Sequence, residues 1–365
     1  MKGKLKIWKI VFLLFLMAGT IYIIRNNRNN LEKEKASKNW QKSDEKGNTY
    51  SSESIDDKYI RNRGNVFGTY YSITYRSPKD HHEAIRERLA AVDNSLSPFN
   101  SRSLITAINE NRDTVADEMF TTVFNLAQEV SAKTGGAFDI TVAPLVNAWG
   151  FGFRNNIPVD SSAIDSMRQH VGYTGIALEN GKVTKKFPET MLNCSAIAKG
   201  YGCDAVAALL AENGIADFLV EIGGEVVAQG NNPKGKNWSI GISKPVDDPT
   251  GSSQELQTVI NASGKGMATS GNYRNYREEN GKKIAHTIDP RTGYPVTHSL
   301  LSATVIAPDC ATADAYATAF MVMGMENAIE VCKAEESIEA YFIYADGNGT
   351  LATSMTGGFK EHIIE

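Results

Sequence analysis

The sequence predicts an α+β fold, with mixed sheets and packed helices in a single globular domain. Strand and helix patterns are both present, but they do not alternate as strict strand–helix–strand units. Apolar residues make up 42% of the 365-residue chain, which is enough for one large core. The 38 basic and 42 acidic residues nearly balance, so nothing indicates the basic face that a nucleic-acid partner requires.

The first 24 residues are expected to anchor the chain in a membrane. Four lysines in MKGKLKIWK are followed by the apolar run IVFLLFLMAGTIYII. The stretch from Ile7 to Ile24 is just long enough to span a bilayer, and the preceding lysines favour a cytoplasmic N-terminus. A cleavable signal peptide is the alternative, but apolar residues continue beyond the small-residue cluster AGT, which favours an uncleaved signal anchor. The rest of the chain is then expected on the outer face of the cytoplasmic (inner) membrane, in the periplasm or its equivalent.

Residues 25–58 are rich in Asn, Lys, Glu and Ser, so we expect a solvated polar linker there. The globular domain is expected over residues 59–365. Its four cysteines have mostly small or apolar neighbours, and no CxxC pair or histidine cluster indicates a zinc site. Buried free thiols are therefore predicted, with a Cys194–Cys203 bridge as the alternative.

Periodicity places the elements in order. A strand is predicted over 68–77, where β-branched and aromatic residues lie between turn formers. Helices follow at 82–96 and at 117–136, the second capped by Asp117 and ended by Gly135. Their expected inner faces carry Ile85, Leu89, Val92 and Leu96, and Phe120, Val123, Leu126 and Val130.

A third helix is predicted over 196–214, stopped at Asn213-Gly214. The segments 217–230 and 237–243 are expected to be paired strands, and 300–308 another strand. Two helices, 310–324 and 325–336, are separated by Gly324, and 338–355 is expected to form a hairpin around Asp346-Gly347.

Two segments indicate ligand binding. Residues 134–152 place Gly, Pro, Trp and Phe around the single carboxylate of Asp139, which suits the wall of an aromatic ligand site. Residues 193–204 place Lys199 just inside a helix start, where an ammonium and backbone amides suit a phosphate. The alternatives are an irregular packed connection and an ordinary solvated lysine. Gly223-Gly224 does not open a helix, so it predicts a tight hairpin or a bulge and not a dinucleotide-binding turn.

Two further segments indicate catalysis. Asp314 and Thr318 are four residues apart on a predicted helix, so their oxygens share a face and could hold a hard cation such as Mg²⁺. An acidic residue favoured by the helix dipole is the alternative. In AHTIDPRTGYPV, His286 supplies an ionisable ring, and two turn signals follow it. Asp289 is expected to be a turn-capping carboxylate, with a role in orienting His286 as the alternative.

Taken together, these segments resemble the ApbE family, the FAD:protein FMN transferases. The resemblance covers roughly residues 63–359 and rests on several motifs in the family's order. The most specific is GGAFDITVAPLVNAWGFG, and others are FGTYYSITY, LSPFNSRSLITAIN, CSAIAKGYGCD, VEIGGEVVAQG, ATSGNYRNY, AHTIDPRTGYPV and ADAYATAFMVMG.

The resemblance implies that FAD is bound as a substrate, that Mg²⁺ holds its pyrophosphate, and that FMN passes to a Thr or Ser hydroxyl of an acceptor protein while AMP leaves. It implies acceptors of the Rnf- and Nqr-type redox complexes, which carry a D-G-x-T-type motif. The implied FAD contacts are Phe67, Phe99, Ala137, Phe138, Asp139, Asn193, Lys199 and Ile288; the implied metal positions are the Ala196 carbonyl, Asp314 and Thr318; and His286 is the implied catalytic base.

Two residues depart from the family pattern: Phe67 stands where Met is usual, and Asn193 stands where Asp is common. Two other functions use the same residues differently. Water in place of the acceptor hydroxyl would make the protein an FAD pyrophosphatase that releases FMN and AMP. A non-catalytic FAD-binding protein would need the aromatic wall but not His286 or the Asp314–Thr318 pair, and all three are present.

Overall fold

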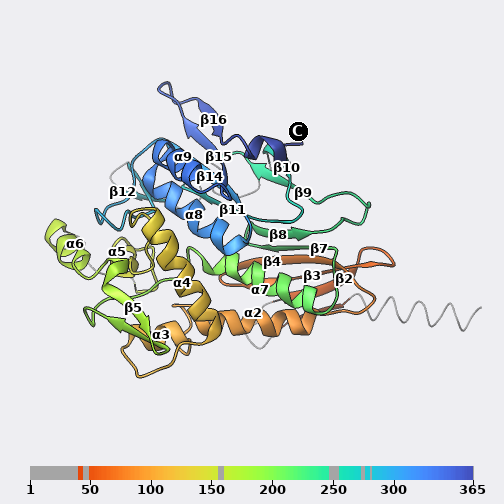
Figure 1. Ribbon diagram of the computed structural model, residues 1–365, viewed down its shortest axis with the longest axis horizontal. Helices are drawn as coiled ribbons and strands as arrows, with labels where there is room; N and C mark the ends of the chain where they lie inside the picture. The colour runs from red at the N-terminus through yellow and green to blue at the C-terminus, as the bar shows by residue number, and fades with distance from the viewer. Residues whose placement is uncertain are drawn as a thin grey trace, which may run out of the picture.

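The computed structural model describes residues 40–43, 49–154, 160–245, 255–272, 276–279 and 282–364. Within these ranges the fold is α+β, as predicted, and is built on one large sheet with helices packed on it (Figure 1). No helix in the described part is long and apolar enough to cross a bilayer. The predicted anchor, residues 1–24, lies outside the described residues.

The large sheet has ten strands in the described part of the chain, and every neighbouring pair is antiparallel. Their spatial order is β1 (Trp40–Ser43), β2 (Thr49–Ser54), β3 (Tyr59–Val66), β4 (Thr69–Arg76), β7 (Phe218–Ile222), β8 (Glu225–Gln229), β11 (Lys265–Gly271), β14 (Leu300–Ala307), β15 (Glu339–Ala345) and β16 (Leu351–Met355). The expectation of mixed sheets is therefore wrong for the described strands. Tight hairpins join β3 to β4 and β7 to β8, and a two-residue connection permits only antiparallel pairing.

Three two-stranded sheets stand apart from the large sheet: β5 (Ile176–Glu179) with β6 (Lys182–Lys185), β9 (Ser239–Ser243) with β10 (Leu256–Asn261), and β12 (Tyr276–Glu279) with β13 (Lys282–Ala285). The strand at 237–243 was predicted, but its expected pairing with 217–230 is wrong. Residues 218–229 form a hairpin of their own through Gly223-Gly224, and β9 pairs with β10 instead.

The described helices are α2 (His82–Leu96), α3 (Leu104–Asn109), α4 (Glu118–Lys133), α5 (Ala143–Ala148), α6 (Ser161–Arg168), α7 (Ala198–Glu212), α8 (Cys310–Met323) and α9 (Met325–Ala334), with 3-10 turns at Tyr173–Gly175 and Phe359–His362. Helices α2, α4, α7 and α8 lie together in front of the sheet in Figure 1. The predicted helices are confirmed, including the Asp117 cap of α4, which accepts a hydrogen bond from the Phe120 amide, and the break at Gly324.

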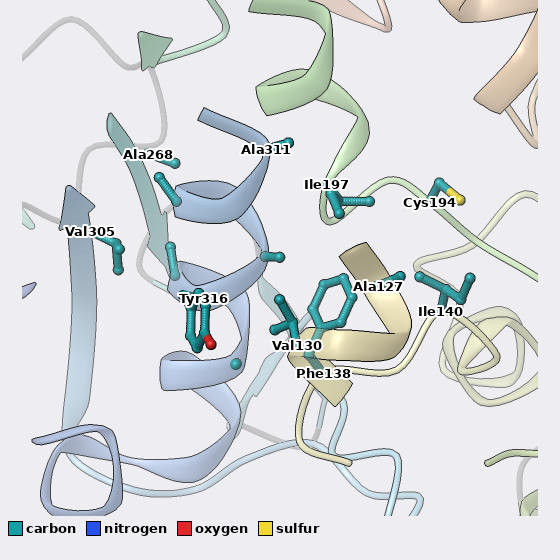
Figure 2. Packing of buried hydrophobic residues seen from close by; sticks show 14 of the residues in the cluster. Ala127, Val130, Phe138, Ile140, Cys194, Ile197, Ala268, Val305, Ala311 and Tyr316 are labelled. Atoms are coloured by element: carbon teal, nitrogen blue, oxygen red, sulfur yellow. The ribbon is translucent and has the colours of Figure 1, made fainter. Parts of the chain in front are cut away.

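The main core lies between α4, α8 and the sheet. Figure 2 shows Tyr316 of α8 between the strands that carry Ala268 and Val305 and the side chains of Val130 and Phe138. Alternate strand residues point to the other face of the sheet, where Met267 and other side chains pack against β9, β10 and Phe359. Helix α8 is buried nearly all round, which fixes its position between α7 and the sheet.

The expected linker over 25–58 is wrong where the structure describes it, because β1 and β2 extend the sheet beyond β3. Residues 25–39 and 44–48 of that expected linker lie outside the described residues. Hydrophobic periodicity could not reveal β2, because its sequence TYSSES is polar. It is held instead by backbone pairing, by a 3.0 Å hydrogen bond from the side-chain Nδ2 of Asn62 to Oγ of buried Ser52, and by Arg86 stacked 3.8 Å over the Tyr50 ring. All four cysteines are free and buried, as predicted, so the Cys194–Cys203 bridge does not form.

Candidate active site

One cavity of about 1930 Å³ is lined by all the residues that the resemblance implies as FAD contacts, metal ligands or catalytic base. Its walls come from the β3–β4 turn, the end of α2, the segments before and after α5, the start of α7, the β7–β8 turn, β9, β11 and α8. The residues implied by the resemblance that line it are Phe67, Phe99, Ala137, Phe138, Asp139, Asn193, Ala196, Lys199, His286, Ile288, Asp314 and Thr318. Residues up to about 250 positions apart in the sequence therefore face one volume, although their individual roles remain predictions.

An ion cluster lies where α7, α8 and the β7–β8 hairpin meet. The Lys199 ammonium is 2.7 Å from Glu225 Oε1 and 3.8 Å from Asp314 Oδ1. Both carboxylates are nearly inaccessible, at 4% and 3% side-chain exposure, whereas Lys199 keeps 30% and reaches the cavity. When both acids are ionised, the single charge of Lys199 neutralises only one of them, so the wall suits an additional cation.

Burial raises the pKa of Glu225 to about 7, although the charge of Lys199 opposes this rise. Burial alone would lower the pKa of Lys199, but the charges of Asp314 and Glu225 outweigh it and raise that pKa above its ordinary value. Lys199 is therefore a permanent ammonium at neutral pH, as the binding of a phosphate group requires.

The close approach of α7 and α8 places Asp314. The Gly200 amide donates a 3.0 Å hydrogen bond to Asp314 Oδ2. A Cβ at Gly200 would lie 2.3 Å from the Cys310 carbonyl oxygen, so only glycine allows the two helices to meet here. One turn further along α8, the Thr318 hydroxyl lies 3.3 Å from Ser270 Oγ of β11.

The donor set fits a hard cation such as Mg²⁺. Asp314 and Thr318 supply oxygens on one face of α8, and the Ala196 carbonyl belongs to the turn just before α7. Glu225 Oε2 is buried without a hydrogen-bond partner, an arrangement that a bound cation or its water would complete. Within the described residues, no group of three or more His, Cys, Asp and Glu side chains is placed to hold a metal ion. Mg²⁺ usually keeps several water and phosphate ligands and needs only one or two carboxylates from a protein.

His286 follows directly after β13 and lines the same cavity as Asp314. Its ring meets Phe151 edge to face, with 6.3 Å between ring centroids. The turn after it is closed by a 2.8 Å hydrogen bond from the Gly293 amide to the Asp289 carbonyl oxygen. The Asp289 carboxylate accepts hydrogen bonds from the Arg291 amide and guanidinium, which is the turn-capping role expected for it.

Phe67 occupies the first position of the two-residue β3–β4 turn. Its φ of 51° and the 74° of Gly68 match a type I′ hairpin, which is unusual for a residue as large as Phe. A Cβ on Gly202 of α7 would lie 2.7 Å from the Phe67 ring, so the ring packs directly on that glycine at the cavity wall. The strained backbone is therefore held by this packing, as is common at functional sites.

The Asp139 carboxylate is buried, and both of its oxygens accept hydrogen bonds. It accepts hydrogen bonds from the amide and hydroxyl of Thr141 and from the Tyr173 amide. Burial raises its pKa, and these hydrogen bonds act in the opposite direction. Asp139 therefore fixes the loop that carries Ala137 and Phe138, and this positioning role exists whether or not the carboxylate also contacts a ligand.

Two other predicted contacts differ in their surroundings. Phe99 is 66% exposed and forms a T-shaped contact with Phe153, with 6.0 Å between ring centroids, so much of its ring surface remains accessible from the cavity. Asn193 closes a local turn, since its Oδ1 accepts a 2.9 Å hydrogen bond from the Ser195 amide. An Asp at this position could accept the same bond, so the departure from the family pattern leaves this turn intact.

Glu225 and Ser270 are site residues that sequence reasoning missed. Glu225 lies directly after the glycine pair of VEIGGEVVAQG, and a carboxylate at the start of an apolar strand is itself a signal of a buried ion pair. Ser270 has no such signal, because its contact with Thr318 depends on the packing of β11 against α8.

Comparisons with known proteins agree with this geometry. The model of the ApbE family matches residues 67–342. A FAD:protein FMN transferase from Haemophilus influenzae is 37% identical over 325 residues, covering 83% of this chain and 91% of its own, and one from Klebsiella pneumoniae is 35% identical over 316 residues, covering 82% and 88%. Among solved structures, a flavin transferase ApbE from Vibrio cholerae superposes with a TM-score of 0.75 at 32% identity, covering 84% of this chain and 99% of its own.

The shared fold and the length of the matches define the class: this protein is an enzyme with the flavin transferase fold. The chain belongs to the ApbE family.

Proposed function

We propose that this protein transfers FMN from FAD to a threonine or serine hydroxyl of an acceptor protein and releases AMP. The observation that carries the proposal is the single cavity that unites His286 with Lys199 and with the Asp314–Thr318 pair. A ring that can accept a proton, a fixed ammonium and hard oxygen donors are the parts that phosphoryl transfer to an alcohol requires. The names of the relatives support the same reaction.

The chain's own groups bind and orient FAD in this account. The exposed ring of Phe99 and the loop of Ala137 and Phe138 offer an apolar wall for the flavin rings. Lys199 attracts the pyrophosphate, because its ammonium is fixed by Glu225 and still reaches the cavity. Asp314 and Thr318, with the Ala196 carbonyl, would hold Mg²⁺; bound there, Mg²⁺ neutralises charge on the phosphate oxygens and on the departing AMP.

His286 takes the proton of the acceptor hydroxyl. The hydroxyl oxygen then forms a bond to the phosphorus of the FMN half, and the bond from that phosphorus to the bridging anhydride oxygen breaks. AMP leaves with the bridging oxygen, and the acceptor keeps FMN as a phosphate ester. An imidazole with an ordinary pKa of about 6.5 can accept this proton at neutral pH.

The proposed acceptor is a subunit of an Rnf- or Nqr-type redox complex, and the proposed location is the outer face of the cytoplasmic membrane. The second proposal rests on the N-terminal lysines and apolar run, which predict a signal anchor with the catalytic domain outside the cytoplasm.

The test uses the full chain with FAD, Mg²⁺ and a soluble domain of an Rnf-type subunit that carries the D-G-x-T motif. We expect the acceptor to become covalently fluorescent, and the same domain with its motif threonine changed to alanine to remain unlabelled. If neither domain is labelled although FAD is bound, the proposed function is wrong.

A further inference from the structure

Strand β9 forms part of the cavity wall along its whole length. All five of its residues line the cavity, together with Leu256 of its partner β10. Among the described strands β9 pairs with β10 alone, so its second edge has no strand beside it. An edge of this kind presents unpaired backbone amides and carbonyls.

The register shows which backbone groups point to that edge. Val259 of β10 is opposite Gly241 of β9, and its carbonyl oxygen accepts a 2.8 Å hydrogen bond from the Ile364 amide on the far side of β10. Because opposed residues of an antiparallel pair direct their backbone groups either both inward or both outward, Gly241 also points outward, away from β10. The same alternation directs Ser239 outward, and both residues are exposed.

The two edges of the β9–β10 sheet differ within the described part of the chain: the β10 edge is covered by other residues, and the β9 edge is open. The C-terminal residues Ile363 and Ile364 close the β10 edge through a bridge to Ile260 and the bond to Val259. The β9 edge has the sequence SIGIS, with no charge and no proline. Proteins commonly protect an open strand edge with charged residues or proline. Because β9 has neither, its edge inside the cavity is suited to the addition of another strand.

The cavity also has room and an apolar rim for a polypeptide. Its volume of about 1930 Å³ exceeds the roughly 300–1000 Å³ of an ordinary ligand pocket. Tyr70, Phe99 and Leu256 line it although they are 49%, 66% and 52% exposed. A Cβ at Gly241 would lie 2.6 Å from Leu256 Cδ2, so this exposed leucine side chain extends over the outward-pointing glycine.

We propose that the open edge of β9 binds the hydroxyl-bearing segment of the acceptor protein as an added strand. The backbone groups of Ser239 and Gly241 pair with the acceptor main chain, and Leu256 contacts its side chains. This inference rests on the proposed function, because the second substrate is then a polypeptide that must enter the same cavity as FAD. Recognition through main-chain bonds fixes the path of the segment and demands little of its sequence.

The test compares Ser239→Pro with Ser239→Ala in the full chain. Both variants lose the hydroxyl, but only proline removes the outward amide, and neither changes the bonds between β9 and β10. With the D-G-x-T acceptor domain as probe, we expect Ser239→Pro to raise the KM for the acceptor about 3- to 10-fold, the effect of one lost hydrogen bond, with FAD affinity unchanged. Ser239→Ala keeps the outward amide, so its acceptor KM should rise clearly less than that of Ser239→Pro.

Equal acceptor KM values for the two variants would overturn the inference while leaving the transfer reaction itself established. The inference is also wrong if Ser239→Pro changes only the oligomeric state, since the edge would then bind a second copy of the chain. Should Ser239→Pro fail to fold, hydrogen exchange of the wild-type protein tests whether the acceptor pairs with β9. Slower exchange of the Ser239 and Gly241 amides on addition of the acceptor supports strand addition, and unchanged exchange there contradicts it.

Discussion

At the scale of single residues, His286 is the side chain whose removal should separate binding from chemistry. It lines the cavity with Lys199 and Asp314 but belongs to the segment after β13 and not to their ion cluster. We expect His286→Ala to keep FAD affinity and to slow transfer to the acceptor by about 10²- to 10⁴-fold, the usual contribution of general base catalysis. FAD binding is measured by calorimetry, and transfer by fluorescence of the acceptor.

The matched control is His170→Ala, because His170 packs against Phe187 outside the cavity lining. It should transfer at the wild-type rate. Transfer by His286→Ala at the rate of this control would show that another group takes the proton.

Asp314 tests the metal site. Its carboxylate is buried and shares a face of α8 with Thr318. We expect Asp314→Asn to raise the Mg²⁺ concentration needed for FAD binding and transfer roughly tenfold or more, because a neutral amide replaces the carboxylate proposed as the charged ligand. Asp309→Asn, which changes the N-cap of the same helix, is the control for a lost charge. A Mg²⁺ titration that is the same for both variants would refute the site.

At the scale of elements, Asp204 links α7 to α8. Its carboxylate accepts hydrogen bonds of 2.9 Å and 2.8 Å from the Cys310 and Ala311 amides at the start of α8. Burial nevertheless raises its pKa to about 7 from an ordinary value of 3.8. A raised carboxyl pKa means that the folded state binds the proton more tightly, so the associated stability is complete below the unfolded pKa and is lost as pH rises through the folded pKa.

We therefore expect the wild type to lose unfolding free energy relative to Asp204→Asn between about pH 4 and pH 7, the interval between the ordinary and the raised pKa. The asparagine cannot ionise, so its variant lacks this loss. Thermal unfolding of both proteins at several pH values, without FAD or metal, measures the difference. A difference that stays constant across this range, or changes in favour of the wild type as pH rises, contradicts the assignment.

Most helices and strands could be predicted because the spacing of apolar residues in the sequence matched the faces that the fold buries. The helix 82–96 matches α2 residue for residue, since its apolar spacing and its burial coincide. Strand β2 was missed because its polar sequence is stabilised by contacts to Asn62 and Arg86 that are distant in the chain. The pairing of β9 was wrong for a similar reason: sequence order placed it next to β8, but register with β10 depends on packing.

The candidate site could be assembled from the sequence only through the resemblance. Locally, an ordinary helical acid explains Asp314 as well as a metal ligand does. Glu225 shows what remained hidden, since its 2.7 Å contact with Lys199 joins a hairpin to a helix start. The neighbouring Lys199–Asp314 pair depends on the close approach that Gly200 allows between α7 and α8, which no local pattern encodes.

At the scale of the whole molecule, the sheet extends beyond the predicted domain start at residue 59. A chain that begins at residue 59 lacks β1 and β2 and loses the bond between Ser52 and Asn62, whereas a chain that begins at residue 40 keeps both strands. We expect the shorter protein to melt at a lower temperature, by about 2–4 °C for each 1 kcal/mol lost. Equal melting temperatures would show that β1 and β2 add no stability.

The central claim is that the cavity couples cleavage of FAD to modification of a protein. Its most direct test measures AMP, free FMN and covalently bound flavin in one reaction of the full chain with FAD, Mg²⁺ and the D-G-x-T acceptor domain. The account predicts one AMP for each flavinylated acceptor, little free FMN, and a strong dependence of AMP release on the acceptor. Equal amounts of AMP and free FMN, formed at the same rate without the acceptor, would identify a pyrophosphatase and contradict the account.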